Sequence, residues 1–547
     1  MTTNVDTGSA PRDTTVPRSE AVSHARRIAG HPLTWRAAPV LAALAIGVVY
    51  LIAEPRTRDL AAATFRARLF GDVGFTLWNG TWYAGHPTWS YSVLVPPLAW
   101  LLSPPLLGAA SALVSAALFE PLARRHFGAR GARWGALWFG AAAATPMLSG
   151  RMTFSAGVAA ALGAALAVQR GRPWLGCGLA ILTGLLSPVA ALFLALAGLA
   201  YALAGSRRVG AAMTIAALAG PAVVSLVFPD GREGPFVFSA FWPVPLFALA
   251  FCAAAPARER ALRIGAALYG SGAIAVFLIP TPLGGNLVRF GALVGGPLLL
   301  CALLAGGRRL SIPLVALLVA FGAWQWSAAV RDIAETSGDP STQASYYRPL
   351  NDFLAHAGTG HAFRVEIPFT FSHWETAEVS PRFSIARGWL RTDDVQYNHL
   401  FYGGTLNAAT YRSWLTGHGV RFVAVPHAEP DYSARAELRL IAGGLPYLKL
   451  VWSSRDWRVF EVAGRGTMVS PARAKLVRLG VDDAALRFDG PGAAVVRIRW
   501  SPYWRAPGAC VERAGEWTRV IAKRAGEVRL AQSFSLGRVF DHGRRCA

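Results

Sequence analysis

The sequence has few of the groups that soluble enzymes use for chemistry. It contains no glycine-rich phosphate loop between a strand and a helix, no nucleophile elbow and no zinc-binding spacing of cysteine and histidine. Charged residues make up 16% of its 547 residues, and only 31 are acidic. Its long apolar stretches hold almost no carboxylates, apart from Glu120 near the end of one. These absences disfavour nucleotide-dependent enzymes and zinc hydrolases, and also proton-coupled transporters, which place carboxylates near the membrane midplane.

Cysteine is scarce, with five residues in the chain. Three of them, Cys177, Cys252 and Cys301, lie in or beside apolar stretches, where we expect small packing residues. The other two cysteines, Cys510 and Cys546, lie after the last apolar stretch. If this part of the chain faces an oxidising compartment, a disulfide between them is expected.

Long apolar stretches dominate the first 330 residues. The composition is 53% hydrophobic with a mean hydropathy of +0.35, which indicates a polytopic α-helical membrane protein. We expect about eleven spans, since each apolar stretch is about as long as a membrane-crossing helix. They are placed at 38–54, 104–122, 132–149, 152–168, 173–187, 189–204, 210–228, 240–256, 261–279, 287–305 and 310–330.

The arginines predict the orientation of these spans. Short cytoplasmic loops retain positive charge, and arginine clusters recur after every second span. The protein is therefore expected in the plasma membrane with its N-terminus in the cytoplasm and residues 331–547 outside. The formal net charge of +23 fits loops attracted to anionic lipid headgroups, and nucleic acid is not an expected partner. The clusters are Arg26/Arg27/Arg36, Arg124/Arg125/Arg130/Arg133, Arg170/Arg172, Arg207/Arg208, Arg258/Arg260/Arg263 and Arg308/Arg309.

Composition divides the chain into four parts. Residues 1–36 are expected to be a disordered cytoplasmic tail, and residues 37–330 a transmembrane domain whose first outer loop covers 55–103. Residues 331–464 alternate helix-like and strand-like runs, including a helix at 346–356, and predict an extracytoplasmic α/β domain. Residues 465–547 carry short alternating runs separated by glycine and aspartate, which predict a β-sandwich or jelly roll.

The first outer loop is unusually rich in reactive and aromatic side chains. Its segment RDLAAATFRARLFGDVGFTLWNGTWYAGHPTWSYS, residues 58–92, holds Asp59, Asp72 and His86. A plain connector between helices needs none of these. The start of the segment has an apolar face opposite its arginines, so we expect an amphipathic helix on the outer leaflet. Five aromatic residues follow: Trp78, Trp82, Tyr83, Trp89 and Tyr91.

Each of these residues also has a purely structural interpretation. Asp59 could pair with Arg56 or cap the following helix, and His86 could make a structural hydrogen bond. The aromatic side chains, Trp82 and Tyr83 among them, could stack on sugar rings or form an interfacial belt. 

Two solitary arginines at predicted outer ends of spans, Arg151 and Arg289, could hold a phosphate or simply reach toward the membrane surface.

The order of these parts resembles that of GT-C-type integral membrane glycosyltransferases. The chain is also similar to a family of actinobacterial membrane proteins with a YfhO-like layout. The segments that carry this similarity are LWNGTWYAGHPTWSYSVLVPPL and, further on, FSAFWPV, RVEIPF and WLTGHGVRFVAVP. The resemblance implies transfer of a sugar from a polyprenyl-phosphate donor to an envelope glycan, lipid or protein acceptor outside the membrane.

The resemblance also implies roles for individual residues. Asp59, just past the first span, would be the general base on the acceptor hydroxyl, with Asp72 as a second acidic residue. Substrate binding would fall to His86, Trp82, Tyr83, Arg151 and Arg289. No metal ligands are predicted, because the loop has no DxD or ExD sequence. The use of a divalent cation as a cofactor nevertheless remains possible. The alternatives are a non-catalytic envelope scaffold that binds glycan and a transporter of lipids or small molecules.

Overall fold

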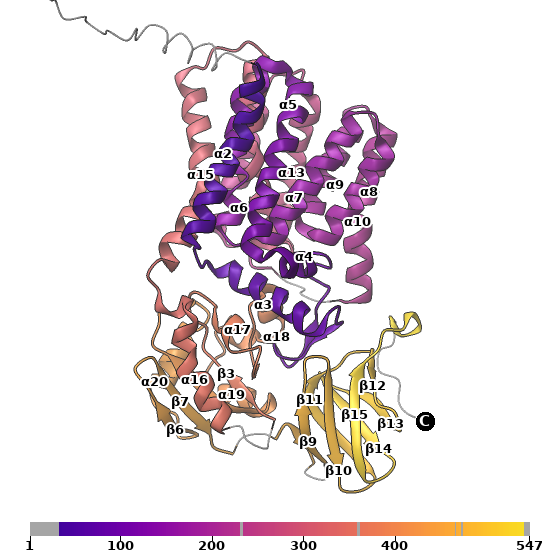
Figure 1. Cartoon of the computed structure of the whole chain (residues 1–547), viewed down its shortest axis with the longest axis vertical. Helices are drawn as coiled ribbons and strands as arrows, with labels where there is room; N and C mark the ends of the chain where they lie inside the picture. Colours follow the sequence, from indigo (N-terminus) through magenta and orange to yellow (C-terminus); the bar gives the residue numbers. More distant parts are fainter. Residues whose placement is uncertain (1–31, 230–233, 358–361, 465–466, 472–473, 541–547) are drawn as a thin grey trace, which may run out of the picture.

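The computed structural model describes residues 32–229, 234–357, 362–464, 467–471 and 474–540. Most of the predicted cytoplasmic tail and Cys546 lie outside these ranges. Figure 1 shows a helical bundle at one end, with an α/β region and a β region side by side at the other.

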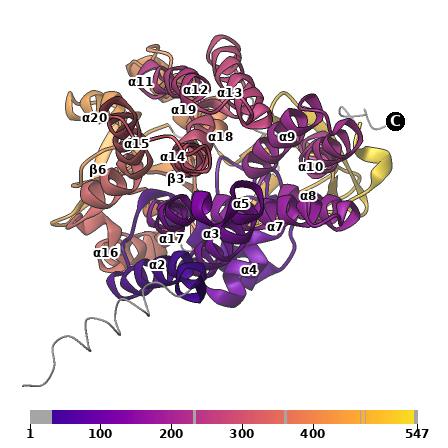
Figure 2. The same ribbon diagram turned by 90° about the horizontal axis from the view of Figure 1, so that it is seen from above.

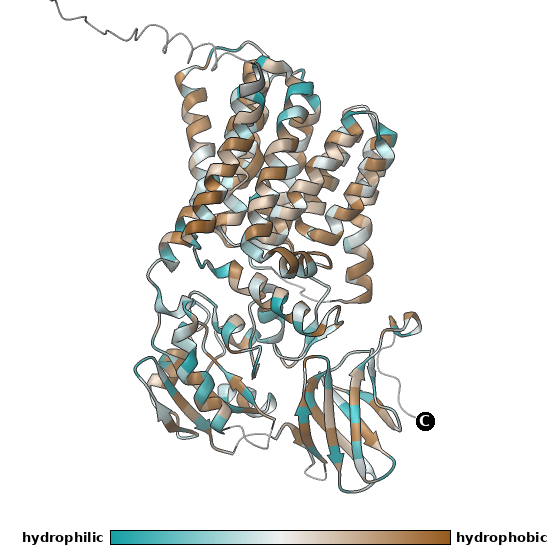
Figure 3. Ribbon diagram, viewed as in Figure 1, coloured by the Kyte–Doolittle hydropathy of each residue, from teal (hydrophilic) through white to brown (hydrophobic). Residues whose placement is uncertain are grey.

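The bundle supplies the membrane part of the molecule. By length and composition, seven helical segments of the described chain can cross a membrane, and three further apolar helical segments are shorter. Apolar residues dominate these helices, whereas the other end is mixed (Figure 3). The helices are α2 (Pro32–Ala53), α5 (Pro104–Ala142), α6 (Thr145–Leu148), α7 (Met152–Gln169), α8 (Pro173–Leu186), α9 (Pro188–Leu203), α10 (Arg207–Val227), α11 (Phe238–Phe241), α12 (Pro243–Ala254), α13 (Arg260–Leu278), α14 (Val288–Ala305) and α15 (Ile312–Thr336).

Helix α5 is two helices joined by a reversal at Gly128. This glycine has φ 75° and ψ 166°, which breaks the helical backbone. Phe119 and Phe139 stack with their ring centroids 4.0 Å apart, although a straight helix would separate them by about 30 Å. The chain therefore folds back, as the separate spans predicted at 104–122 and 132–149 require. Figure 2 shows the bundle from above, with α5 among its neighbours α2, α7 and α14.

Helix α3 (Arg58–Val73) lies between the bundle and the α/β and β regions, close to α4 (Val95–Leu102) (Figure 1). Its apolar side chains, such as Phe65, are buried. Its basic side turns to the α/β region, because Arg68 donates to the carbonyl of Ala377 at 3.0 Å. The expected helix is thus present, but its apolar face packs against protein and not against lipid as predicted.

A mixed five-stranded sheet forms the α/β region. Its strand order is β4-β3-β5-β7-β6, with β3 parallel to β4 and β5 and the other neighbours antiparallel. The helix expected at 346–356 is α16. The strands are β3 (Arg364–Glu366), β4 (Ser384–Ile385), β5 (Val420–Pro426), β6 (Leu448–Ser453) and β7 (Trp457–Val462), and the helices are α16 (Ala344–Ala357), α17 (Glu375–Glu378), α18 (Arg391–Tyr397), α19 (Ala408–Gly417) and α20 (Arg435–Ala442).

Two four-stranded antiparallel sheets, β12-β15-β10-β9 and β13-β14-β11-β8, form the β region. Alternate residues of both sheets share one apolar core, as a sandwich requires. Trp78, from the small hairpin β1 (Trp78–Asn79) and β2 (His86–Pro87), packs against Trp504 in that core. The first loop is thereby anchored to the β region. The strands are β8 (Val469–Ser470), β9 (Ala474–Leu479), β10 (Asp483–Phe488), β11 (Gly492–Arg499), β12 (Trp504–Arg505), β13 (Ala509–Ala514), β14 (Trp517–Ala522) and β15 (Gly526–Gln532).

Candidate functional site

Asp59 lies in the first turn of α3 and faces two arginines of the bundle. Its Oδ2 accepts a hydrogen bond from Arg151 Nε at 3.2 Å and lies 4.0 Å from Arg289 Nη2. The side chain remains 34% exposed. The structural alternative of a pair with Arg56 is wrong, because Arg56 binds Glu378 at 3.2 Å instead. The structure therefore brings together three residues that the sequence predicted separately: Asp59, Arg151 and Arg289.

Asp332, near the end of α15, extends this group. It accepts a hydrogen bond from Arg58 at 2.8 Å and lies 3.6 Å from Arg151. Its side chain is buried. Asp332 was not identified from the sequence because it stands at the start of a stretch that reads as a linker after the last span. Only the fold shows that this stretch returns to the first loop.

The arginines determine how readily Asp59 binds a proton. Burial by itself raises the pKa of Asp59, but the charges of Arg151, Arg289 and Arg58 and the hydrogen bond from Arg151 outweigh it. The pKa of Asp59 therefore lies below its ordinary value. In this arrangement Asp59 is ionised and is a weak base.

Arg151 and Arg289 line a cavity of about 540 Å³ between the bundle and the α/β region. Arg331 and Arg391 line it as well, and no carboxylate is found among its described lining residues. Asp59 lies behind the two bundle arginines and lines a much smaller adjoining space of about 20 Å³. A large cavity with this charge is suited to an anion.

Of the two bundle arginines that approach Asp59, Arg289 has the weaker contact with it. Its side chain is only 16% exposed, and its closest ion pair is the 4.0 Å contact with Asp59. None of its N–H groups has a hydrogen-bond acceptor within the described residues. A guanidinium removed from water normally has its donors paired, so this one has the capacity to bind an oxyanion.

A second cavity, of about 460 Å³, lies within the bundle and is almost entirely apolar. Trp324 lines both cavities, and Phe290, next to Arg289, lines the apolar one. The apolar cavity and the basic cavity are therefore neighbours that share the wall formed by Trp324. The aromatic residues that line the apolar cavity are Phe119, Phe127, Tyr201, Phe247, Phe251, Tyr269, Phe290, Phe321 and Trp324.

Asp72 does not join this site. It is exposed in the last turn of α3, about 20 Å along the helix axis from Asp59. It lines none of the four cavities that border α3 or the bundle arginines or lie within the bundle. The structure therefore does not bring Asp72 to Asp59 and the arginines, and its catalytic role stays a prediction.

The predicted aromatic binding residues serve packing instead. Trp82 is fully buried, stacks on Phe65 and donates to Ser380 Oγ at 2.8 Å. Tyr83 is also fully buried, and its hydroxyl donates to the carbonyl of Gly388. Neither ring has a face free for a sugar, which corrects the binding role predicted for both. Their positions show how the first loop is fastened to the α/β region.

His86 is placed in the same packed interface. It lies 3.2 Å from the amide nitrogen of Asn79 and 3.7 Å from Asp393, and its ring stacks on Trp82. His86 lines a narrow space of about 40 Å³, and neither Arg151 nor Arg289 is among the residues that line this space. This geometry fits the interpretation of His86 as a residue that makes a structural hydrogen bond. It does not fit the predicted contact of His86 with substrate.

No group of three or more His, Cys, Asp or Glu side chains in the described ranges could hold a metal ion. Cys510 is disulfide-bonded, whereas Cys177, Cys252 and Cys301 are free. Cys546, its predicted partner, lies outside the described residues.

Comparison with known proteins adds no relative to this description. The chain matches no protein-family model and no curated protein.

Proposed function

We propose that the protein is a membrane glycosyltransferase that moves a sugar from a polyprenyl-phosphate donor to an envelope glycan, lipid or protein acceptor. In this proposal the bundle is GT-C-like and has about eleven spans. The N-terminus lies in the cytoplasm of a cell with an envelope, and the α/β and β regions lie outside the plasma membrane.

One observation supports the proposal most strongly: Asp59 is paired with two arginines that line a cavity without carboxylates among its described lining residues, next to an apolar cavity. Phosphate on a long isoprenoid chain combines the two chemistries that these cavities offer. The chain would lie in the apolar cavity, and the phosphate would accept hydrogen bonds from Arg151 and Arg289. A soluble sugar nucleotide would leave the apolar cavity without a function.

Binding of the donor would also activate Asp59. A phosphate that competes for Arg151 and Arg289 removes the positive charge that lowers the pKa of the carboxylate. Asp59 then becomes a stronger base at the moment when the donor is present. The acceptor hydroxyl attacks the anomeric carbon, its proton passes to Asp59, and the bond from that carbon to the phosphate oxygen breaks. The polyprenyl phosphate leaves with its charge stabilised by the arginines.

The test compares Asp59→Asn with Asp72→Asn. Both changes remove one carboxylate of α3 and preserve side-chain size, but only Asp59 reaches the arginines. Purified protein in nanodiscs would receive radiolabelled polyprenyl-phosphate sugars and an envelope extract as acceptor. We expect Asp59→Asn to lower transfer by about 100-fold or more without loss of donor binding, because it removes the base and not the phosphate contacts.

Asp72→Asn should retain transfer close to that of the unmodified protein. The proposal fails if the unmodified protein transfers none of the sugars tested, or if the two variants lose transfer equally. Donor binding without transfer would favour a lipid transporter, and absence of both would favour a scaffold.

A further inference from the structure

The α/β region contributes a basic side chain to the bundle's cavity. Arg391 and Thr392, at the start of α18, are the described residues from beyond α15 that line it. Arg151 and Arg289 belong to the opposite, bundle side. The cavity therefore has basic groups on two walls, one formed by the bundle and one by the α/β region.

The guanidinium of Arg391 is held by one edge and leaves the other edge open. Its Nη1 and Nη2 donate to the two carboxylate oxygens of Asp431 at 3.0 and 2.8 Å. Nη1 also donates to the hydroxyls of Tyr402 and Ser433. Neither Nε nor the second hydrogen of Nη2 has an acceptor in the described part of the chain. These two donors form the side edge of the guanidinium, whose parallel N–H groups fit a carboxylate or phosphate.

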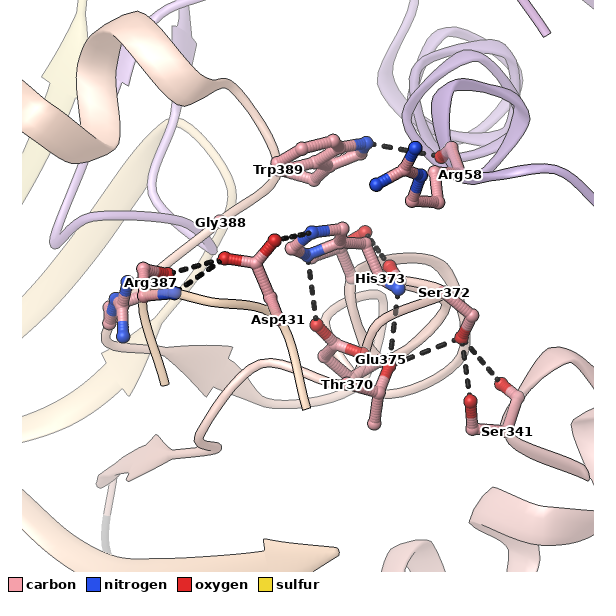
Figure 4. A network of polar contacts seen from close by, with 12 residues as sticks. Arg58, Ser341, Thr370, Ser372, His373, Glu375, Arg387, Gly388, Trp389 and Asp431 are labelled. Atoms are coloured by element: carbon pink, nitrogen blue, oxygen red, sulfur yellow. Dashed lines mark hydrogen bonds and ion pairs between the residues drawn. The ribbon is translucent and has the colours of Figure 1, made fainter. Parts of the chain in front are cut away.

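A buried network fixes the position of Arg391. Asp431 Oδ2 lies 3.4 Å from His373 Nε2, and His373 Nδ1 lies 3.5 Å from Glu375 Oε1 (Figure 4). The His373 ring stacks on Trp389 at 3.5 Å, and Trp389 Nε1 donates to the carbonyl of Arg58 at 3.1 Å. Figure 4 shows this chain of contacts from the α/β region to α3.

Electrostatics strengthens the same arrangement. Burial by itself raises the pKa of Asp431, but its contacts with His373 and Arg391 hold the pKa well below the ordinary value. Asp431 thus remains ionised and keeps the guanidinium in place. A side chain that is held so firmly, has unpaired donors and lines a cavity is suited to bind a ligand.

We infer that Arg391 forms a second anion-binding subsite, which recognises a carboxylate or phosphate group on the acceptor. This inference depends on the proposed function for the assignment of the first anion, the donor phosphate, to Arg151 and Arg289. The two walls of the cavity then bind different substrates: the bundle binds the donor, and the α/β region binds an anionic acceptor. His373 and Asp431 are positioning residues for Arg391.

The test asks whether two anions bind at once. Full-length protein in nanodiscs would be saturated with farnesyl phosphate and then titrated with inorganic phosphate or with glucuronate by calorimetry. Arg391→Lys preserves the charge opposite Asp431 but lacks the side edge, so the protein should still fold. We expect this variant to bind the second anion about tenfold more weakly, with farnesyl phosphate affinity unchanged within about twofold.

Two further variants separate the subsites. Arg289→Gln should weaken farnesyl phosphate binding, whereas Arg435→Gln, an exposed arginine paired with Glu429, should change neither affinity. His373→Gln should weaken binding of the second anion, as Arg391→Lys does. Which of the two anions binds better distinguishes a phosphate-bearing from a carboxylate-bearing acceptor.

The inference is overturned if neither anion binds to the saturated protein, or if Arg391→Lys binds both as well as the unmodified protein. Failure of farnesyl phosphate to bind would count against the proposed function alone. In that case the anions are titrated into the unliganded protein, and a loss confined to Arg391→Lys would still support the subsite.

Discussion

Ion pairs between distant segments define the site at the scale of residues. Asp59 and Asp332 between them contact Arg58, Arg151 and Arg289 at 2.8 to 4.0 Å. Each carboxylate serves two arginines, so an incoming phosphate can replace a carboxylate without leaving the arginines unpaired. In the proposed function, such exchange would let this cluster of charges be stable without substrate and still bind the donor phosphate.

A pair of buried carboxyl groups in the α/β region predicts how stability depends on pH. Glu366 and Glu437 are both fully buried in the α/β region. Burial raises the pKa of Glu437 from 4.5 to about 7 and that of Glu366 well above its ordinary value. Their folded pKa values exceed the unfolded ones, so their contribution to stability is fully present below about pH 4.5 and is lost as pH rises.

We therefore expect the thermal midpoint of the protein to fall between pH 5 and pH 8, and Glu437→Gln to flatten this slope, as measured by differential scanning fluorimetry. Gln preserves an acceptor for the Tyr411 hydroxyl, which donates to Glu437 at 2.7 Å. Glu429→Gln, at an exposed position, is the control. An identical pH slope in Glu437→Gln and the unmodified protein would refute the assignment.

At the scale of elements, the beginning of α3 is placed by a close contact with Gly150. A β-carbon at Gly150 would lie 2.4 Å from the Leu60 backbone nitrogen and 3.0 Å from the Asp59 carbonyl carbon. The glycine also has φ +77°, which disfavours other residues. Because Arg151 follows directly, this contact sets the distance between Asp59 and its main partner.

Gly150→Ala should therefore displace the start of α3 and lower transfer by about tenfold or more, even in protein that still folds. Gly171→Ala is a matched control, since Gly171 has φ +75° but nothing within 4 Å of an added β-carbon. Radiolabel transfer and thermal midpoints of both variants provide the measurement. Equal losses of transfer in the two would show that only backbone strain matters.

Regular elements could be predicted from the sequence because their signals are local. Apolar length located the helices of the bundle, and short alternating runs placed a β-rich region at 465–547, where the strands β8 to β15 lie. The placement of α3 could not be predicted, because its apolar face suits lipid and protein equally. The partners that decide the matter, Glu378 and Ala377, lie more than 300 residues away.

The candidate site also combines residues that local sequence can identify with residues that only long-range contacts reveal. Asp59, Arg151 and Arg289 could each be proposed from their places next to predicted spans. Asp332 and Arg391 could not, because nothing in their neighbouring sequence links them to a cavity. Trp82 and Tyr83 were misassigned since an aromatic residue that fastens two regions has the same composition signal as one that stacks on a sugar.

At the scale of the whole molecule, the proposal requires the α/β and β regions to face the outside. The predicted orientation follows from arginine-rich loops, and the disulfide of Cys510 suits an oxidising compartment. A reporter that is active only in the cytoplasm, fused after Gly338, should therefore be inactive. The same reporter fused after Gly205 should be active, and the reverse pattern would overturn the orientation.

The most direct test of the central claim is a cryo-electron microscopy structure of the full-length protein in nanodiscs with a polyprenyl monophosphate. The proposed function predicts phosphate density within hydrogen-bonding distance of Arg151 and Arg289, with Asp59 released from at least one of them. The chain should run into the apolar cavity beside Trp324, and Arg289→Gln should lose the phosphate density. Phosphate bound elsewhere, or unchanged density in Arg289→Gln, would contradict the account.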